Sequence, residues 1–228
     1  MISIHRHTRP ISVAAALLIS IGSTGCSNLS NTQRGAVIGA GAGGVVGAMV
    51  GGAAGSTTKG AIIGAVVGGA AGALIGRRMD DKARILANEL DGATVERVGE
   101  GILVTFDSGV LFDFDSSALR HEARANLGEL ARVLSAEIGD YQLLVAGHTD
   151  ASGSEEYNQH LSERRAEQAA TFLAESGLPA SQVRTVGRGE MEPIASNETE
   201  TGQAQNRRVE FAIFASEAFR EQARRRAG

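Results

Sequence analysis

The chain has 228 residues, a formal net charge of -4 and a pI near 5.8, and these values exclude general nucleic-acid binding, which needs a dominant basic surface. The length suits one ordinary domain with a smaller segment beside it. The 30 glycines are concentrated in one region, so we expect a segmented chain.

Residues 1–25 have the layout of an export signal, with Arg6 and Arg9 followed by the apolar run ISVAAALLISIG. This run is shorter than the about 20 residues of a membrane-spanning helix. The STG that precedes Cys26 resembles a bacterial lipobox, in which the cysteine becomes the acylated first residue of the mature protein. We therefore expect a lipoprotein signal peptide and lipidation at Cys26, with an ordinary export signal as the alternative.

An acylated Cys26 would hold the protein at the outer-membrane lipid, since each buried methylene contributes about 0.8 kcal/mol. The lipobox resemblance implies that sorting is read at the next residue. Ser27 is not the Asp associated with inner-membrane retention, so the periplasmic side of the outer membrane is favoured. Residues 26–34 are expected to form the lipidated N-terminus and a linker. The lone cysteine excludes an internal disulfide.

Glycine then recurs at every fourth position. The two tracts are Gly35, Gly39, Gly43, Gly47, Gly51 and Gly55, then Gly60, Gly64, Gly68, Gly72 and Gly76. This spacing aligns the glycines on one helical stripe, against which another backbone can pack closely. The pattern predicts a glycine-zipper helical hairpin over residues 35–77. Membrane insertion, a homo-oligomer and a flexible spacer remain open, although the strict period favours the first two.

A polar, amphipathic connecting helix is expected over residues 78–92, and the soluble domain over 93–215. Residues 93–107 suggest a β-hairpin around a glycine-containing turn. A helix follows, with Asp115 or Ser116 as its N-cap and a buried stripe that reaches Ile138. Residues 216–228 are expected to form a basic C-terminal tail, as a frayed helix or an irregular end, that is solvated.

Three strands and a second helix complete the domain. The strands are predicted at YQLLVAG, QVRTVGRG and RRVEFAIFA, and the helix at SEEYNQHLSERRAEQAATFLAESG, where Gly177 closes it. The resulting order β-α-β-α-β-β predicts an α+β fold with a mixed sheet and two helices on one face.

Two charged residues of this region, Asp150 and Arg165, form the candidate site. With Leu161 and Ala169 on the inward stripe of the second helix, Arg165 faces inward and Arg164 outward. A buried guanidinium needs a carboxylate or an anionic ligand. Asp150, at the end of the preceding strand, is the expected partner, either in a structural salt bridge or in a ligand site.

Catalysis is the rival interpretation, with His148 and Asp150 as an acid/base pair or as metal ligands on alternate strand positions. No nucleophile motif or metal-ligand spacing accompanies them in the sequence. We therefore expect a binding protein and not an enzyme, with no cofactor and no metal.

Several motifs in order resemble the OmpA C-terminal domain family. They are LFDFDSSAL, GHTD with Gly153, Asn158 and LSERRA, and GQAQNRRVEF, and they span roughly residues 100–214. With the lipobox and the glycine tracts, the whole layout is similar to a glycine-zipper OmpA-family lipoprotein. The resemblance implies a β-α-β-α-β-β fold and non-covalent binding of peptidoglycan through the diaminopimelate of its stem peptide.

The resemblance also implies the ligand-binding residues, with Asp150 and Arg165 as the principal pair. The flanking contributors are Asp113, Thr149, Asn158, Leu161 and Arg207. The implied function is a lipid-anchored tether between the outer membrane and the cell wall. The alternatives are a protein whose main work is glycine-zipper assembly, with wall binding only for placement, and a stress or assembly factor.

Overall fold

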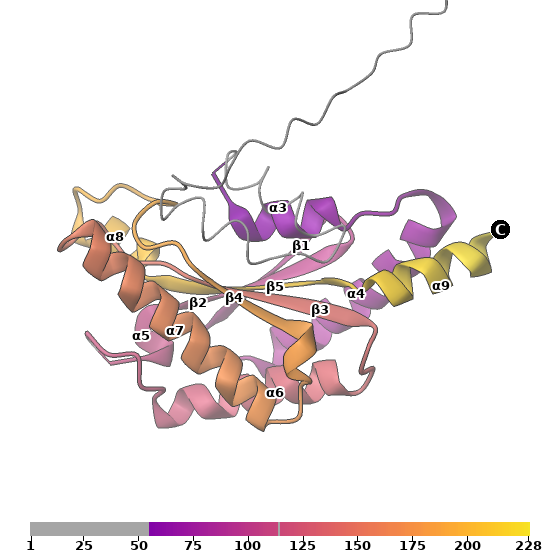
Figure 1. Cartoon of the computed structure of the whole chain (residues 1–228), viewed down its shortest axis with the longest axis horizontal. Coiled ribbons are helices and arrows are strands. Elements are labelled where there is room, and N and C mark those ends of the chain that lie inside the picture. Colours follow the sequence, from indigo (N-terminus) through magenta and orange to yellow (C-terminus); the bar gives the residue numbers. More distant parts are fainter. Residues whose placement is uncertain (1–54, 114) are drawn as a thin grey trace, which may run out of the picture.

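The structure, a computed structural model, describes residues 55–113 and 115–228 (Figure 1). The predicted signal peptide, the lipidation site Cys26, the linker at 26–34 and the glycines from Gly35 to Gly51 lie outside the described residues. The described part contains the expected soluble domain and the second glycine tract. None of the helices in this part is both long and apolar enough to cross a lipid bilayer.

The order of the elements agrees with the prediction. The helices are α3 (Thr57–Gly64), α4 (Gly69–Glu89), α5 (Ser108–Leu111), α6 (His121–Ser135), α7 (Glu155–Glu175), α8 (Glu200–Asn206) and α9 (Glu217–Ala227), with a 3-10 turn, η1, at Ala180–Gln182. The strands are β1 (Ala93–Val98), β2 (Gly101–Asp107), β3 (Tyr141–Gly147), β4 (Val183–Gly187) and β5 (Arg208–Ala215). The α+β class is confirmed.

The five strands form one mixed sheet in the order β1-β2-β5-β3-β4. β1 and β2 form the expected antiparallel hairpin, which turns at Gly99 with a φ of 53°. β5 lies between β2 and β3 and is antiparallel to both. β3 and β4 are parallel, because a helical crossover through α7 connects them. This topology brings the end of β3 beside the start of β5, where the candidate site lies.

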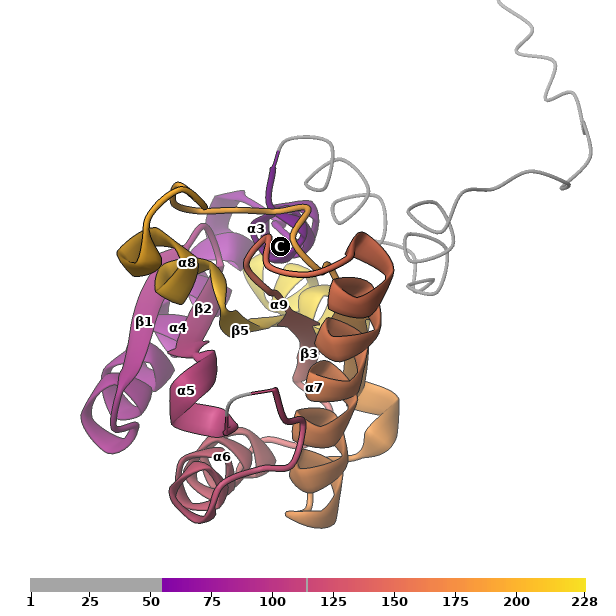
Figure 2. The same cartoon turned by 90° about the vertical axis from the view of Figure 1, so that its left-hand side faces the viewer.

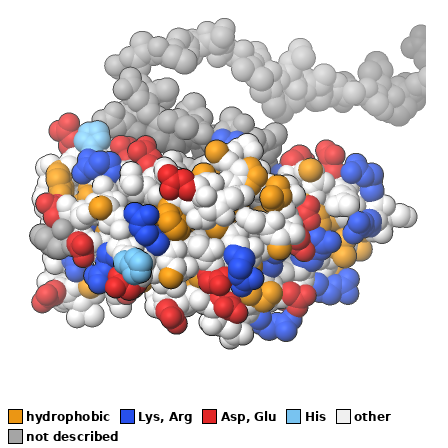
Figure 3. Space-filling model, turned by 90° about the horizontal axis from the view of Figure 1, so that it is seen from below, with side chains coloured by type: hydrophobic (Ala, Val, Ile, Leu, Met, Phe, Trp, Pro, Cys, Tyr) orange, Lys and Arg blue, Asp and Glu red, His pale blue; other side chains and the backbone are white. Residues whose placement is uncertain are grey.

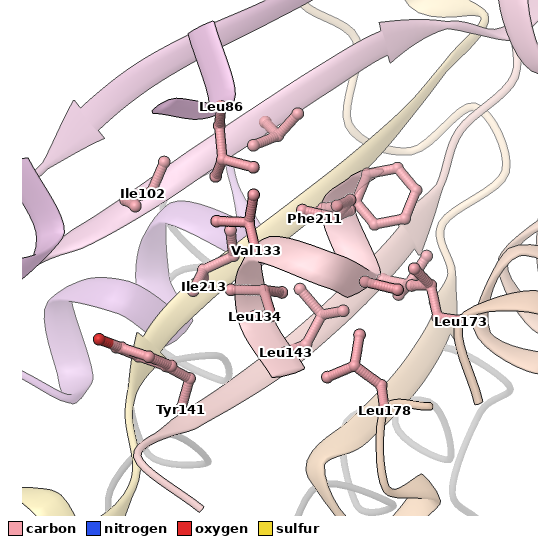
Figure 4. Packing of buried hydrophobic residues seen from close by; sticks show 14 of the residues in the cluster. Leu86, Ile102, Val133, Leu134, Tyr141, Leu143, Leu173, Leu178, Phe211 and Ile213 are labelled. Atoms are coloured by element: carbon pink, nitrogen blue, oxygen red, sulfur yellow. The ribbon is translucent and has the colours of Figure 1, made fainter. Parts of the chain in front are cut away.

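The main core lies between one face of the sheet and helices α4, α6 and α7. Figure 4 shows Leu86 of α4, Leu134 of α6 and Leu173 of α7 packed with Phe211 and Ile213 of β5. The prediction of helices on one face is confirmed for α6 and α7. Seen from below, the surface intersperses acidic and basic side chains with small apolar areas (Figure 3), as expected for helices with a solvated outer side.

Helix α6 is shorter than predicted at both ends. It begins at His121 because Phe112 and Leu119 form an isolated bridge, which holds the segment between them outside the helix. It ends at Ser135, and Ile138 lies beyond it with 60% of its surface exposed. The predicted N-cap and the last residue of the predicted stripe are therefore wrong.

The second glycine tract does not form one continuous arm of a hairpin. Gly64 ends α3, and Gly68 and Gly69 adopt φ angles of 73° and 61° before α4 continues the chain. Glycine tolerates these left-handed conformations, whereas its helix propensity is low, so a turn forms where packing favours one. The connecting helix accordingly begins at Gly69 and not at residue 78.

Both parts of this tract pack on the sheet domain. α3 covers the face opposite α6 and α7, as Figures 1 and 2 both show, and places Ala61 and Ile62 against Leu103, Leu144 and Ala212. α4 contributes to the main core on the other face. The packed unit therefore begins at α3, well before the predicted boundary at residue 93.

The predicted C-terminal tail is the ordered helix α9. Ser216 caps its N-terminus by accepting a hydrogen bond from the Phe219 amide. Phe219 is 1% exposed and meets Tyr141 edge-on at a centroid distance of 6.1 Å, while the guanidinium of Arg78 lies 4.9 Å from its ring centre. The prediction of a solvated tail is therefore wrong, because one apolar stripe of this basic segment joins the core.

Candidate functional site

The candidate site lies just after β3 and just before β5. The last residue of β3, Gly147, pairs with Val209 of β5, and the ladder continues past the strand through a hydrogen bond of 2.9 Å from the His148 amide to the Arg208 carbonyl oxygen. The Thr149 amide donates to the carbonyl oxygen of Gly189 at 2.8 Å. The backbone of the site is therefore fixed from both neighbouring strands.

Helix α7 supplies the second side of the site. Ser154 caps its N-terminus by accepting a hydrogen bond from the Tyr157 amide. Arg165 is 4% exposed and Arg164 is exposed, so the predicted inward and outward orientations are confirmed. The inward face of α7 thus carries a guanidinium among buried apolar residues and the polar side chains of Asn158 and Ser162.

Asp150 pairs with Arg207 and not with Arg165. The Arg207 guanidinium donates to Oδ2 of Asp150, and the Ser152 amide donates to Oδ1 at 2.9 Å. Burial of this side chain raises the pKa of Asp150, but the bonds from Arg207 and Ser152 outweigh that effect and leave the pKa below its ordinary value. The site therefore holds a fixed, ionised carboxylate.

Arg165 is buried, and no carboxylate among the described residues forms an ion pair with it. Its Nε donates to the Ser116 carbonyl oxygen at 2.9 Å, and its guanidinium lies 5.4 Å from the ring centre of Phe112. Within residues 55–113 and 115–228, its two terminal nitrogens make no hydrogen bond or ion pair. Burial lowers its pKa, and the charge of Asp115 opposes this shift. The expected Asp150–Arg165 salt bridge is therefore not formed, and donors of Arg165 remain available.

Three further predicted site residues, beside Asp150 and Arg165, are buried. Asn158 donates to the Asp150 carbonyl oxygen at 3.2 Å and to Oε2 of Glu190 at 2.6 Å. Thr149 is 5% exposed, and its hydroxyl has no hydrogen-bond partner within the described residues. Leu161 is buried on α7. Asn158 thus links the Asp150 turn to the loop after β4.

The two aspartates of LFDFDSSAL have different surroundings. Asp113 is exposed, and its carboxylate lies 3.5 Å from Arg120. Asp115 adopts a φ of 57° and accepts a hydrogen bond from the Tyr157 hydroxyl, and its charge acts on Arg165. The structure therefore brings Asp115, which we predicted as an N-cap and not as a site residue, toward the buried guanidinium, while Asp113 pairs with Arg120. Sequence alone offers no basis for choosing between two aspartates separated by one residue.

His148 belongs to a different cluster from Asp150. Its side chain is 1% exposed and lies 3.7 Å from the carboxylate of Glu210, on the side of the sheet covered by α3. The expected common face of His148 and Asp150 is wrong because β3 ends at Gly147, so strand alternation no longer applies. In the described ranges, no three His, Cys, Asp or Glu side chains converge as metal ligands.

Glu190 and Ser116 were missed in the sequence because both act from loops through single contacts. Together with the predicted residues they form a site with one fixed carboxylate, held by Arg207, and one buried guanidinium with free donors. Such an arrangement suits a ligand that carries an ammonium and a carboxylate.

Comparisons with known proteins identify two matching families and several relatives. The sequence profile of the OmpA family matches residues 111–207, and that of the YMGG-like Gly-zipper matches residues 7–80. The chain is 42% identical over 114 residues to outer membrane protein A of Bordetella avium, covering 50% of this chain and 58% of that protein. It is 37% identical over 141 residues to the probable lipoprotein YiaD of Escherichia coli K12, covering 61% and 64% respectively.

It is also 34% identical over 118 residues to the peptidoglycan-associated lipoprotein of Brucella melitensis, covering 52% of this chain and 70% of that protein. The matches to the Bordetella and Escherichia proteins thus span less than two thirds of their lengths.

Among solved structures, the cell wall anchor of the T6SS from Pseudomonas aeruginosa has a TM-score of 0.53 and 34% identity, covering 59% of this chain and 96% of that one. A putative MotB-like protein from Desulfovibrio vulgaris has a TM-score of 0.54 and 21% identity, covering 64% and 92%, and shares the fold.

Proposed function

Because this chain belongs to the OmpA family, we propose that its site binds peptidoglycan non-covalently through the diaminopimelate of the stem peptide. Support comes from similar proteins, which include a peptidoglycan-associated lipoprotein and a cell wall anchor. Binding without bond breaking is the whole of the proposed activity.

The observation that carries the proposal is the buried Arg165 with free terminal donors, close enough to Asp115 and Asp150 for both charges to act on its pKa. The far end of diaminopimelate in a stem peptide bears a free amino group and a carboxylate. Arg165 takes the carboxylate in a charge-assisted pair, and Asp150 takes the ammonium. The Asp150 carboxylate and the Arg165 guanidinium are already buried and held by hydrogen bonds. The site is therefore pre-organised and loses little conformational entropy on binding.

The flanking residues have supporting roles in this proposal. Arg207 holds Asp150 ionised, and Asn158 holds the turn that carries Asp150. Thr149 and Leu161, which are both buried beside the site, add backbone contacts to the stem peptide. Asp113 contributes from the rim, where it is exposed.

We further propose that acylated Cys26 anchors the protein in the outer membrane, on its periplasmic side, and that the domain tethers this membrane to the cell wall. The lipobox-like sequence supports the anchor, and similar proteins bear the names of lipoproteins and outer-membrane proteins. A homo-oligomer through the glycine zipper remains part of the proposal.

A second candidate function is glycine-zipper assembly, with wall binding only for placement, and the Gly-zipper match over residues 7–80 favours it. Deleting residues 35–54 separates the two candidates while leaving α3 and the sheet domain in place. A tether should still bind peptidoglycan and support envelope integrity, whereas a zipper-driven factor should lose its envelope role.

Co-sedimentation of the detergent-solubilised chain with purified peptidoglycan tests the proposed binding directly. The wild-type chain should pellet with the wall material, and Arg165→Ala should not. Equal pelleting of the two chains would contradict the proposed site.

A further inference from the structure

Two threonines in the first turn of helix α3 bind it to strand β5 and to the loop after β4. The Thr57 amide and hydroxyl donate to the carboxylate of Glu192 at 3.1 and 2.5 Å, and the Thr58 hydroxyl donates to the carboxylate of Glu210. All four side chains are buried. The two threonines come from the segment STTKG, whose sequence indicated only a polar turn between two glycine tracts.

The rest of α3 is held by a small apolar contact. Ile62 is 1% exposed, and a Cβ atom added at Gly101 would lie 2.5 Å from its Cγ2, so the helix approaches β2 where only glycine leaves room. Beyond the helix, the amides of Val67 and Gly68 donate to Glu100, each at 2.8 Å. An eight-residue helix with two glycines is unstable alone in water, so α3 stays helical only while it is docked.

The carboxylates under α3 form a charged cluster with residues of the sheet. Glu192 lies 3.2 Å from Nε of Arg188, and Glu210 accepts a hydrogen bond of 2.7 Å from Nε of Arg208. His148 lies 3.7 Å from Glu210. Loss of α3 would remove the threonine donors and admit water to this cluster, which is otherwise protected from solvent.

One loop connects this cluster with the candidate site. In residues 188–192, the Gly189 carbonyl oxygen accepts from the Thr149 amide, Glu190 accepts from Asn158, and Glu192 accepts from Thr57. One short loop is therefore held by the site at Gly189 and Glu190 and by α3 at Glu192.

We propose that α3 is a detachable strap whose docking holds the loop 188–192 and so maintains the affinity of the site for its ligand. This inference rests on the proposed peptidoglycan binding. The predicted lipid anchor precedes α3 in the chain, so a pull between anchor and wall reaches α3 before it reaches the site. Undocking is an order-to-disorder transition of the strap, and it lowers the affinity for the stem peptide.

Two independent ways of loosening α3 test the coupling in the full chain. Thr57→Val with Thr58→Val removes the hydroxyl donors to the two carboxylates, whereas Ile62→Ala weakens the apolar contact with the sheet. The matched controls are Lys59→Ala, which removes an exposed ion pair with Glu96, and Ile63→Ala, which changes a side chain that is 61% exposed. Hydrogen exchange measures the protection of the α3 amides. Titration with a soluble stem tripeptide that carries diaminopimelate measures the dissociation constant.

Both loosening variants should lose the protection of the α3 amides while α6 remains protected, which shows that the domain is still folded. The dissociation constant should rise at least about fivefold in both and stay unchanged in the controls. An open α3 with unchanged affinity overturns the strap and leaves the proposed function standing. An effect of the threonine variant alone also overturns it, because the loop would then respond to the lost hydrogen bonds and not to docking. If the wild-type chain does not bind the tripeptide, the proposed function fails and the coupling fails with it.

Discussion

The carboxylate of Asp150 is hydrogen-bonded by Arg207, which follows it by 57 residues, and within the described part of the chain Arg165 forms no ion pair. The division assigns different tasks to the two arginines. Arg207 keeps Asp150 ionised, and Arg165 retains free donors for an anion. Each task has its own measurable consequence.

Replacing Arg165 should weaken binding of the stem peptide strongly. Arg165→Ala removes the charge that would meet the carboxylate, and Arg165→Lys keeps a charge but loses the planar donor pair, so both should weaken binding, by about 2–5 kcal/mol for the alanine variant. Isothermal titration with the stem tripeptide measures the loss. The neighbouring Arg164→Ala is the matched control, because Arg164 is exposed on the same helix. Similar losses for both positions would contradict an inward binding role for Arg165.

Replacing Arg207 should shift the pH dependence of binding. With Arg207→Ala, burial is no longer offset by this guanidinium, so the pKa of Asp150 should rise above its value in the wild-type protein. A raised pKa means that Asp150 becomes neutral at a higher pH during acidification, and binding of the ammonium is lost earlier. Affinity measured from pH 7 downward tests this, and Arg207→Lys should restore part of the wild-type profile. Loss of affinity at the same pH in Arg207→Ala and in the wild-type protein would show that Arg207 does not set the ionisation of Asp150.

Gly147 should tolerate no side chain. A Cβ atom there would lie 2.2 Å from the backbone oxygen of Ser162, so Gly147→Ala forces β3 and α7 apart and should cost more than the about 1–3 kcal/mol typical of overpacking. Gly128→Ala on α6 is the control, since nothing lies within 4 Å of its added methyl group and alanine favours the helix by about 1 kcal/mol. The midpoint of urea unfolding should therefore fall for Gly147→Ala and rise for Gly128→Ala.

The buried His148 should make the fold sensitive to mild acid. Burial lowers its pKa below the ordinary 6.5, and the nearby Arg208 acts in the same direction, whereas Glu210 and Glu192 oppose it. Below pH 6.5 the unfolded chain therefore binds a proton that the folded chain resists, and the free energy of unfolding falls as the pH decreases. His148→Gln should flatten this slope between pH 7 and about 5 in urea titrations. The exposed His160→Gln should leave it unchanged.

Helix α9 should contribute to stability despite its basic composition. Phe219→Ala removes a buried ring that meets Tyr141, and it should cost about 3–5 kcal/mol in urea unfolding. Arg225→Ala, on the exposed side of the same helix, should be nearly neutral. A neutral Phe219→Ala would mean that the helix behaves as the solvated tail expected from the sequence.

The sequence by itself determined the strand and helix order of residues 93–215 and the direction in which Arg165 points. These depend on local periodicity, which repeats every two residues in a strand and about every 3.6 in a helix. The family motifs also marked Asp150 and Arg207 as members of one site. Their mutual pairing was not predicted, because it follows from the antiparallel neighbourhood of β3 and β5, which joins distant parts of the chain.

Only the tertiary structure decided the conformation and packing of the segments whose local sequence pattern is compatible with several environments. The glycines from Gly60 to Gly76 fit a zipper, yet α3 docks on the sheet because Thr57 and Thr58 find buried carboxylates there. The tail becomes α9 because a hydrophobic surface is available to Phe219. In each case the deciding free energy comes from contacts between residues far apart in the chain, and periodicity within one segment carries no information about them.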